Sequence, residues 1–191
     1  MFIRRSIPNS FNRRKQAGLT LIELAIGLAI AAALMFGLFY VVGVANAKRL
    51  TTSDAQALTM MANDLRTKFS GQGNFQGLTT STLIQLGIPP EHMINGTALQ
   101  SGFSTPITAT STNVNGQAND GFEFDFAQYP AKSCSDFVMA AAHNFSKVTI
   151  GSNVVKNVGT GNIDGEITVV ELANCEGSNG VVSSLKFAQG R

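Results

Sequence analysis

Charged residues are scarce in this sequence of 191 residues, and that scarcity narrows the classes of protein to consider. Asp, Glu, Lys and Arg together make up 14% of the chain, against roughly 25% in ordinary soluble domains. The formal net charge is only +2, and Lys and Arg are not concentrated on any segment expected to fold, so no nucleic-acid partner is predicted. The apolar share of 44% is too high for a disordered chain.

The motifs of common enzymes and metal sites are also missing. There is no G-x-S-x-G, H-E-x-x-H or Walker A sequence and no C-x-x-C. His92 and His143 are the two histidines, and they are far apart without ligand-like spacing. The segment Ser183–Lys186 matches S-x-x-K, but it lies in an alternating strand pattern and no K-T-G accompanies it, so we interpret it as chance. We expect no catalytic residue, no metal, no cofactor and no enzymatic activity.

One long apolar run is present. Residues 24–45 contain no charged side chain, and as a helix they would extend about 33 Å, enough to cross a hydrocarbon core of about 30 Å. Residues 1–18 hold five basic side chains and no acidic one, whereas Lys48 and Arg49 follow the run. The larger positive cluster stays cytoplasmic, so residues from about 48 onward are expected outside the inner membrane.

Three interpretations of this run compete. A cleaved secretory signal is one, since Ala45-Asn46-Ala47 offers a small-residue site before Lys48, although the run is longer than the usual apolar region of about 7–15 residues. A plain single-pass anchor for a periplasmic domain is the second. The third depends on the residues immediately upstream.

Residues 13–24 read RRKQAGLTLIEL, a basic cluster followed by Gly18 and then by Glu23 at the start of the apolar run. This pattern resembles the class III signal of type IV prepilins. The resemblance implies that a membrane-embedded prepilin peptidase cuts after Gly18 and methylates the new N-terminal amine of Leu19. A leader of 18 residues and Leu rather than Phe as the first mature residue resemble the type IVb subclass more than type IVa.

A carboxylate near the start of a membrane helix needs an explanation. Placing Glu23 there costs something like 2.5–3.5 kcal/mol at mid-bilayer depth. Its natural partner is the positive amine of Leu19 on a neighbouring subunit, because pairing removes an unpaired charge from apolar surroundings. The resemblance implies that this pair sets the register of filament assembly. The alternative is that Glu23 is an ordinary flank in the headgroup zone.

The rest of the chain predicts one long helix and then a mixed domain. Apolar residues in 46–70 follow helical spacing, and no proline occurs between Asn12 and Pro89, so a continuous helix over about 19–70 is expected. Residues 71–120 are predicted to be a long loop with a short helix near 81–86. Further predictions are strands at 121–129, 148–150, 153–157 and 181–187, and a helix within 133–144 capped by Ser133 or Ser135. Residues 159–165 are predicted to be a turn-rich break, and 168–175 either a strand or a short helix that begins with a Thr168–Glu171 capping box.

Cys134 and Cys175 are the two cysteines. An even number of cysteines in an exported domain favours a disulfide, and the resemblance to type IV pilins, bundle-forming and conjugative thin pilins among them, implies that it closes a variable C-terminal region. The expected fold is α+β, with a long N-terminal helix on an antiparallel sheet and one disulfide. The expected divisions are a leader (1–18), a transmembrane or filament-core helix (19–45), an amphipathic half (46–70) and a head (71–191).

The expected function is that of a structural subunit of a type IV pilus serving adhesion, aggregation or conjugation. Its expected partners are other pilin subunits, the prepilin peptidase and the assembly platform of the inner membrane. It would lie in that membrane as a precursor and outside the cell as a filament, with specificity in 71–120 and the Cys134–Cys175 region. The alternatives are a minor pilin, a type II secretion pseudopilin, or an anchored periplasmic binding module that keeps residues 1–18.

Overall fold

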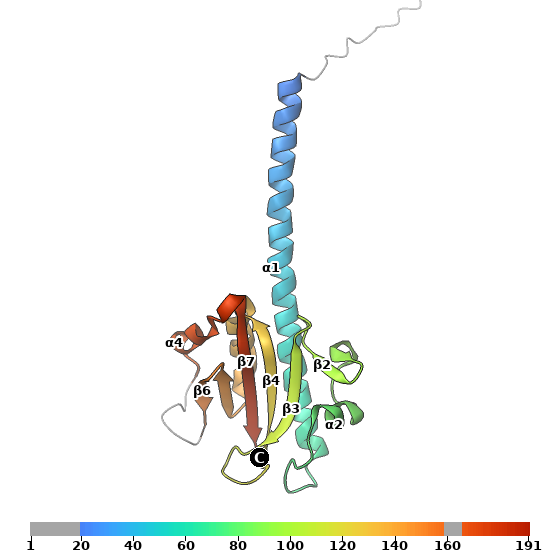
Figure 1. Ribbon diagram of the computed structural model, residues 1–191, viewed down its shortest axis with the longest axis vertical. Coiled ribbons are helices and arrows are strands. Elements are labelled where there is room, and N and C mark those ends of the chain that lie inside the picture. The colour runs from blue at the N-terminus through green and yellow to red at the C-terminus, as the bar shows by residue number, and fades with distance from the viewer. Residues whose placement is uncertain (1–19, 159–165) are drawn as a thin grey trace, which may run out of the picture. The chain divides into compact units, whose positions relative to one another are not determined.

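A computed structural model describes residues 20–158 and 166–191 of the chain. The chain divides into two compact units, Met1–Val42 and Gly43–Arg191. The described part of the first unit is helical and belongs to α1, which runs from Leu21 to Lys68 and is drawn in blue to teal in Figure 1. The second unit holds the rest of α1 and every other element, and we call it the head.

Helix α1 is continuous over most of the predicted range of about 19–70, because no proline interrupts it. The hydroxyls of Thr51, Thr52 and Thr59 each donate to the carbonyl four residues earlier, at 2.9–3.0 Å, which keeps these β-branched polar residues compatible with the helix. Arg66 and Lys68 lie in the last turn, where positive charge favours the carbonyl end of the helix.

The head contains one antiparallel sheet of seven strands in the order β1-β2-β3-β4-β7-β5-β6. The strands are β1 (Ile94–Asn95), β2 (Ala98–Gln100), β3 (Pro106–Thr112), β4 (Gly121–Pro130), β5 (Lys147–Ile150), β6 (Asn153–Asn157) and β7 (Val181–Gly190). The last strand of the chain lies between β4 and β5, with Phe124 opposite Phe187 and Asp125 opposite Lys186. The C-terminal strand therefore completes the centre of the sheet (Figure 1).

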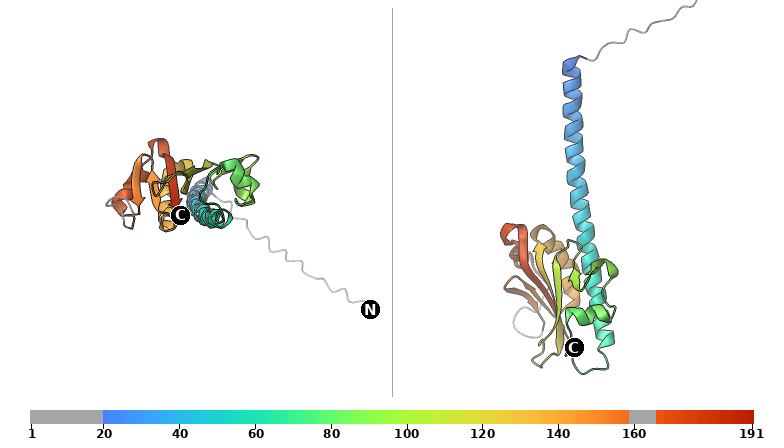
Figure 2. Two further views of the ribbon diagram at one scale, coloured as in Figure 1. Left: turned by 90° about the horizontal axis from the view of Figure 1, so that it is seen from below. Right: turned by 45° about the vertical axis from the view of Figure 1, so that its right-hand side comes forward.

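Short helices connect the strands. The α-helices are α2 (Thr80–Gln85), α3 (Ala131–Ala141) and α4 (Val169–Leu172), and the 3₁₀ turns are η1 (Glu91–Met93), η2 (Ala142–Asn144), η3 (Ala173–Cys175) and η4 (Ser178–Gly180). In the head, α1 lies along one face of the sheet, as the two views of Figure 2 show. That face is the apolar one, so a single core lies between helix and sheet.

Aromatic rings fill much of this core. The ring of Phe137 in α3 stacks on Tyr129 at a centroid distance of 4.7 Å and meets Phe126 edge-on at 4.9 Å and Phe187 at 5.2 Å. The apolar stripe of α1, including Leu58, is fully buried in the same cluster. Aromatic pairs of this kind stabilise beyond the area they bury, by roughly 0.5–1.5 kcal/mol each.

The structure corrects the predicted long loop. Within 71–120 it has the predicted short helix, α2, but also β1, β2, β3 and η1. The strand β3 was missed because its residues, PITATST, are small and polar, although Ile107 and Ala109 alternate with exposed residues and are buried. Pairing with the Phe-rich β4 stabilises β3 as a strand, although its own residues have little strand preference.

The predicted cap of α3 is also wrong. That helix begins at Ala131 after Pro130, which makes no side-chain capping bond, and Ser133 is buried inside the helix. Proline stops the preceding strand and presets the backbone there, so no serine is needed. The strands predicted at 121–129, 148–150, 153–157 and 181–187 are confirmed, whereas the turn-rich break at 159–165 lies outside the described residues.

Candidate functional site

The first half of α1 presents an apolar surface that nothing in the described chain covers. Side chains from Leu21 to Val44 are more than half exposed wherever they are large and apolar, and Phe36 reaches 79%. This is the one described helix that is long and apolar enough to cross a membrane. Leaving such a surface in water is unfavourable, so this half of the helix requires a lipid or protein environment.

At the start of α1, Thr20 and Glu23 are linked in both directions. The Glu23 backbone N–H donates to Thr20 Oγ1 at 3.3 Å, and the Thr20 hydroxyl lies 3.5 Å from Glu23 Oε2. The first bond is the N-cap bond of a capping box, whereas the second joins the two side chains instead of reaching the N-cap backbone. A carboxylate in the first turn is favoured by the free N–H groups there. Sequence reasoning missed this cap, although Thr-x-x-Glu before an apolar run is a usual signal for one. Gly18 and Leu19 lie outside the described residues.

In the head, a buried carboxylate of α1 holds the segment before β3. Asp54 is fully buried, and its carboxylate accepts the Gly102 N–H at 2.7 Å and the Tyr129 hydroxyl at 3.2 Å. Burial raises the pKa of Asp54, although these two hydrogen bonds oppose the rise. Burial and the Asp54 charge raise the pKa of the Tyr129 hydroxyl. Sequence reasoning missed Asp54, yet it precedes Leu58, Met61 and Leu65 at helical spacing, which places it on the buried stripe.

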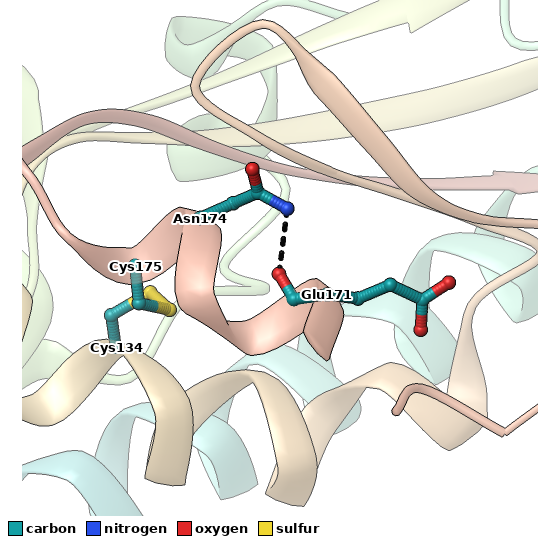
Figure 3. The surroundings of a disulfide bond; sticks show 4 residues. All are labelled: Cys134, Glu171, Asn174 and Cys175. Atoms are coloured by element: carbon teal, nitrogen blue, oxygen red, sulfur yellow. Dashed lines mark hydrogen bonds between the residues drawn. A yellow bond between two sulfur atoms is a disulfide. The ribbon is translucent and has the colours of Figure 1, made fainter. Parts of the chain in front are cut away.

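The two cysteines form the expected disulfide between α3 and η3 (Figure 3). The bond closes a chain separation of 41 residues. Just before Cys175, the Thr168 N–H donates to the Glu171 carboxylate at 2.6 Å, which completes a capping box at the start of α4. Of the two alternatives left open for 168–175, the structure therefore has the helix.

Next to the disulfide, the side-chain amide of Asn174 joins three elements. Asn174 donates through Nδ2 to the Glu171 carbonyl at 2.8 Å, as Figure 3 shows, and accepts at Oδ1 from Asn153 on β6, also at 2.8 Å. The end of α4, the turn η3 and the edge strand β6 are thus fixed to one another. Val169 and Val170, by contrast, are more than four-fifths exposed on α4.

The S-x-x-K segment forms no serine–lysine pair. Lys186 on β7 binds Glu123 at 3.1 Å and lies 3.9 Å from Asp125, whose other oxygen accepts the Ser184 hydroxyl at 2.6 Å. These contacts raise the pKa of Lys186, with the Glu123 hydrogen bond as the main cause. The predicted alternation of β4 is confirmed, since Phe122, Phe124 and Phe126 are buried while its acids pair across the polar face.

His92 lies on η1 and His143 on η2, both exposed. Within residues 20–158 and 166–191, no group of three or more His, Cys, Asp or Glu side chains is arranged to hold a metal ion. The described features therefore comprise an exposed apolar helix with a capped acidic start and a head closed by one disulfide.

Two family models match this chain. The model described as PilS N terminal matches residues 48–185, and the prokaryotic N-terminal methylation motif matches residues 13–39. The first covers most of the head, and the second covers the basic cluster, Gly18, Glu23 and much of the apolar run. No curated protein matches the chain in sequence.

Two solved structures share the fold. The crystal structure of TcpA, a type IV pilin from Vibrio cholerae El Tor biotype, aligns with a TM-score of 0.60 and 16% identity, over 74% of this chain and 99% of that one. The type IVb pilin from Salmonella typhi aligns with a TM-score of 0.53 and 15% identity, over 73% and 98%. At these identities the likeness shows the fold alone.

Proposed function

Because this chain belongs to the PilS family of type IV pilins, we propose that its precursor is cut after Gly18 and that residues 19–191 polymerise into a pilus. Its family and fold are those of pilins, which are structural proteins. We accordingly propose a structural role without catalysis. The chain is type IVb-like: the N-terminal methylation motif over residues 13–39 marks a pilin precursor, and the fold is shared with the type IVb pilin from Salmonella typhi.

The observation that carries the proposal is the uncovered apolar half of α1. A membrane-anchored precursor would place this surface in lipid, and a filament core would place it against the same segment of other subunits. Gly27, Gly37 and Gly43 each leave open space where a Cβ would stand, which permits close approach of neighbouring helices. Transfer from lipid to filament would keep the apolar surface away from water throughout.

Glu23 would act as the register-setting residue of assembly. In the proposed mature chain the Leu19 amine is positive, and pairing it with the Glu23 carboxylate of a neighbour would remove two unpaired charges from apolar surroundings. The Thr20–Glu23 cap supports the role because it fixes the carboxylate at the first turn of α1, close in sequence to the cut.

The remaining divisions follow from this scheme. Residues 1–18 would be the removed leader, 19–45 the membrane and filament-core helix, 46–70 its amphipathic half, and 71–191 the head on the pilus surface. The partners would be the prepilin peptidase and the inner-membrane assembly platform. Adhesion, aggregation or conjugative contact would then depend on residues 71–120 and on the Cys134–Cys175 region.

Substitution at the cleavage position tests processing and assembly together. In cells producing Gly18→Leu, we expect the chain to stay at precursor size in the membrane and sheared filaments to disappear. Gly27→Leu, a matched glycine change inside α1, should leave the removal of residues 1–18 intact. A Gly18→Leu chain that still loses its leader and still enters filaments would contradict the proposal.

A further inference from the structure

A small hollow in the head is bordered by three basic side chains from separate elements. Arg66 comes from the last turns of α1, His143 from η2 and Lys156 from β6, around a volume of about 370 Å³. Among the described residues that line it, none is acidic. The last turns of α1 and the end of β7, which also borders the hollow, lie at the same end of the head (Figure 1).

Two of these bases have no partner among the described residues. Within residues 20–158 and 166–191, the Arg66 guanidinium and the His143 imidazole make no hydrogen bond or ion pair. The ion pairs of the described chain all involve Lys186. The positive charge of Arg66 interacts favourably with the carbonyl end of α1. This interaction does not occupy the N–H donors of the guanidinium, which can still bind a ligand.

Lys156 is held in place at the edge of the same hollow. Its Nζ donates to the Ala142 carbonyl at 2.8 Å, and its side chain is half-buried. Burial lowers the pKa of Lys156, and no carboxylate of the described ranges opposes the effect. A partly desolvated ammonium without a counter-charge is unfavourable, and an anion in the hollow would relieve that cost.

The rest of the lining suits a compact oxyanion. Ser146 and Gln189 contribute neutral polar groups, and the buried ring of Phe145 and the side chain of Val158 give the hollow apolar borders. Arginine in particular matches the geometry of phosphate and related oxyanions.

We propose that this hollow, bordered by Arg66, His143 and Lys156, binds a phosphate or sulfate group. Two Lys156 N–H donors remain after the Ala142 bond, and the free Arg66 fork can meet the same group from α1. The site lies on the surface of the head, and anion binding there would not depend on cleavage of the chain after Gly18. The group could be a free ion or an ester carried on a sugar.

The test uses the full chain in non-ionic detergent micelles, followed by ¹H–¹⁵N NMR at constant ionic strength. Inorganic sulfate, inorganic phosphate, glucose 6-sulfate and glucose 6-phosphate are titrated separately. We expect saturable shifts of the backbone amides of 143–146 and of Lys156 with at least one probe. Tighter binding of the sugar esters would assign an ester as the ligand, and equal binding would assign the ion itself.

Two substitutions that each remove one positive charge test whether anion binding depends on the hollow or only on the net charge of the protein. Arg66 is exposed and without a described partner, so Arg66→Gln should leave the fold intact while raising the dissociation constant about tenfold, the effect of losing one charge-assisted hydrogen bond. Lys132→Gln removes an exposed charge on α3 that does not line the hollow. It should change the dissociation constant less than twofold. Shifts that do not saturate, or equal weakening by both substitutions, would overturn the proposal.

Discussion

The carboxylate of Asp54 in α1 accepts the backbone N–H of Gly102 at 2.7 Å. This bond joins residues 48 positions apart, and it fixes the turn before β3 to the long helix. A Cβ at position 102 would stand 3.1 Å from Leu50 Cδ2 and 3.2 Å from Asp54 Oδ1. Glycine therefore allows the close approach that makes the bond possible.

Replacing Asp54 should destabilise the head. Asp54→Ala leaves two donors, the Gly102 N–H and the Tyr129 hydroxyl, without an acceptor in a buried position, which costs about 1–3 kcal/mol for each donor. We expect a loss of about 2–6 kcal/mol in the free energy of unfolding, measured by denaturant titration of the full chain in non-ionic detergent. Tyr129→Phe, which removes only one partner, should cost about 1 kcal/mol. Wild-type stability in Asp54→Ala would refute this role.

Asp120 should make the stability of the head sensitive to acid. Burial disfavours its charge, but N–H bonds from Val114, Asn115 and Gln117 outweigh burial and lower the pKa of Asp120 below its usual 3.8. A lowered folded-state pKa gives stability that is present above the unfolded value and lost as pH falls through the folded value. The difference in unfolding free energy between wild type and Asp120→Asn should therefore shrink below about pH 4.

The control for this titration is Asp136→Asn. Asp136 is exposed on α3 and makes no hydrogen bond within the described ranges. Because its side chain is exposed and unpaired there, this substitution should change the free energy of unfolding by less than about 0.5 kcal/mol. A constant difference for Asp120→Asn over the same pH range would show that its three N–H bonds do not favour the ionised form.

The disulfide should supply a large share of the stability of the head. In the loop-entropy description, closing a separation of 41 residues contributes about 4 kcal/mol. The double variant Cys134→Ala, Cys175→Ala should lose about that amount in chemical unfolding. Wild type unfolded with a reductant should lose a similar amount, whereas the variant should not respond to the reductant. Loss of less than about 1 kcal/mol would exclude this contribution.

Glu23 should be required for assembly rather than for membrane insertion. Glu23→Gln keeps the size of the side chain and removes the charge, so we expect the precursor to reach the membrane while sheared filaments fall at least tenfold, as quantified by immunoblot. Glu171→Gln, a carboxylate in the capping box of α4, is the matched control and should leave filament yield nearly unchanged. Normal filaments from Glu23→Gln would contradict the proposed pairing with Leu19.

Local patterns predicted most of this architecture. The stripe of α1 and the Phe alternation of β4 are strong periodic signals, and both elements formed where they were expected. Strand β3 could not be predicted, because PITATST has the composition of a loop and is a strand only through its pairing with β4. The start of α3 was also predicted wrongly. The strand β4 ends at Pro130 and α3 follows directly at Ala131, without a capping serine.

The candidate site was predictable in part. The disulfide partners followed from the cysteine count, and Glu23 followed from its position before the apolar run. The Thr20–Glu23 link and the burial of Asp54 also had sequence signals, the Thr-x-x-Glu pattern and the helical spacing of Asp54 to Leu58. The basic hollow had none, because Arg66, His143 and Lys156 come from three elements that only the folded chain brings together.

The most direct test of the account is the intact mass of the protein in filaments sheared from the cell surface, with N-terminal sequencing of the same material. The account predicts a chain that begins at Leu19 with one added methyl group and its disulfide closed. If that chain dominates the sheared fraction, it is the major subunit, and if it is scarce, it is a minor one. A chain that begins at Met1 or Lys48, or that is absent from the filaments, would contradict the claim that it is a processed pilin.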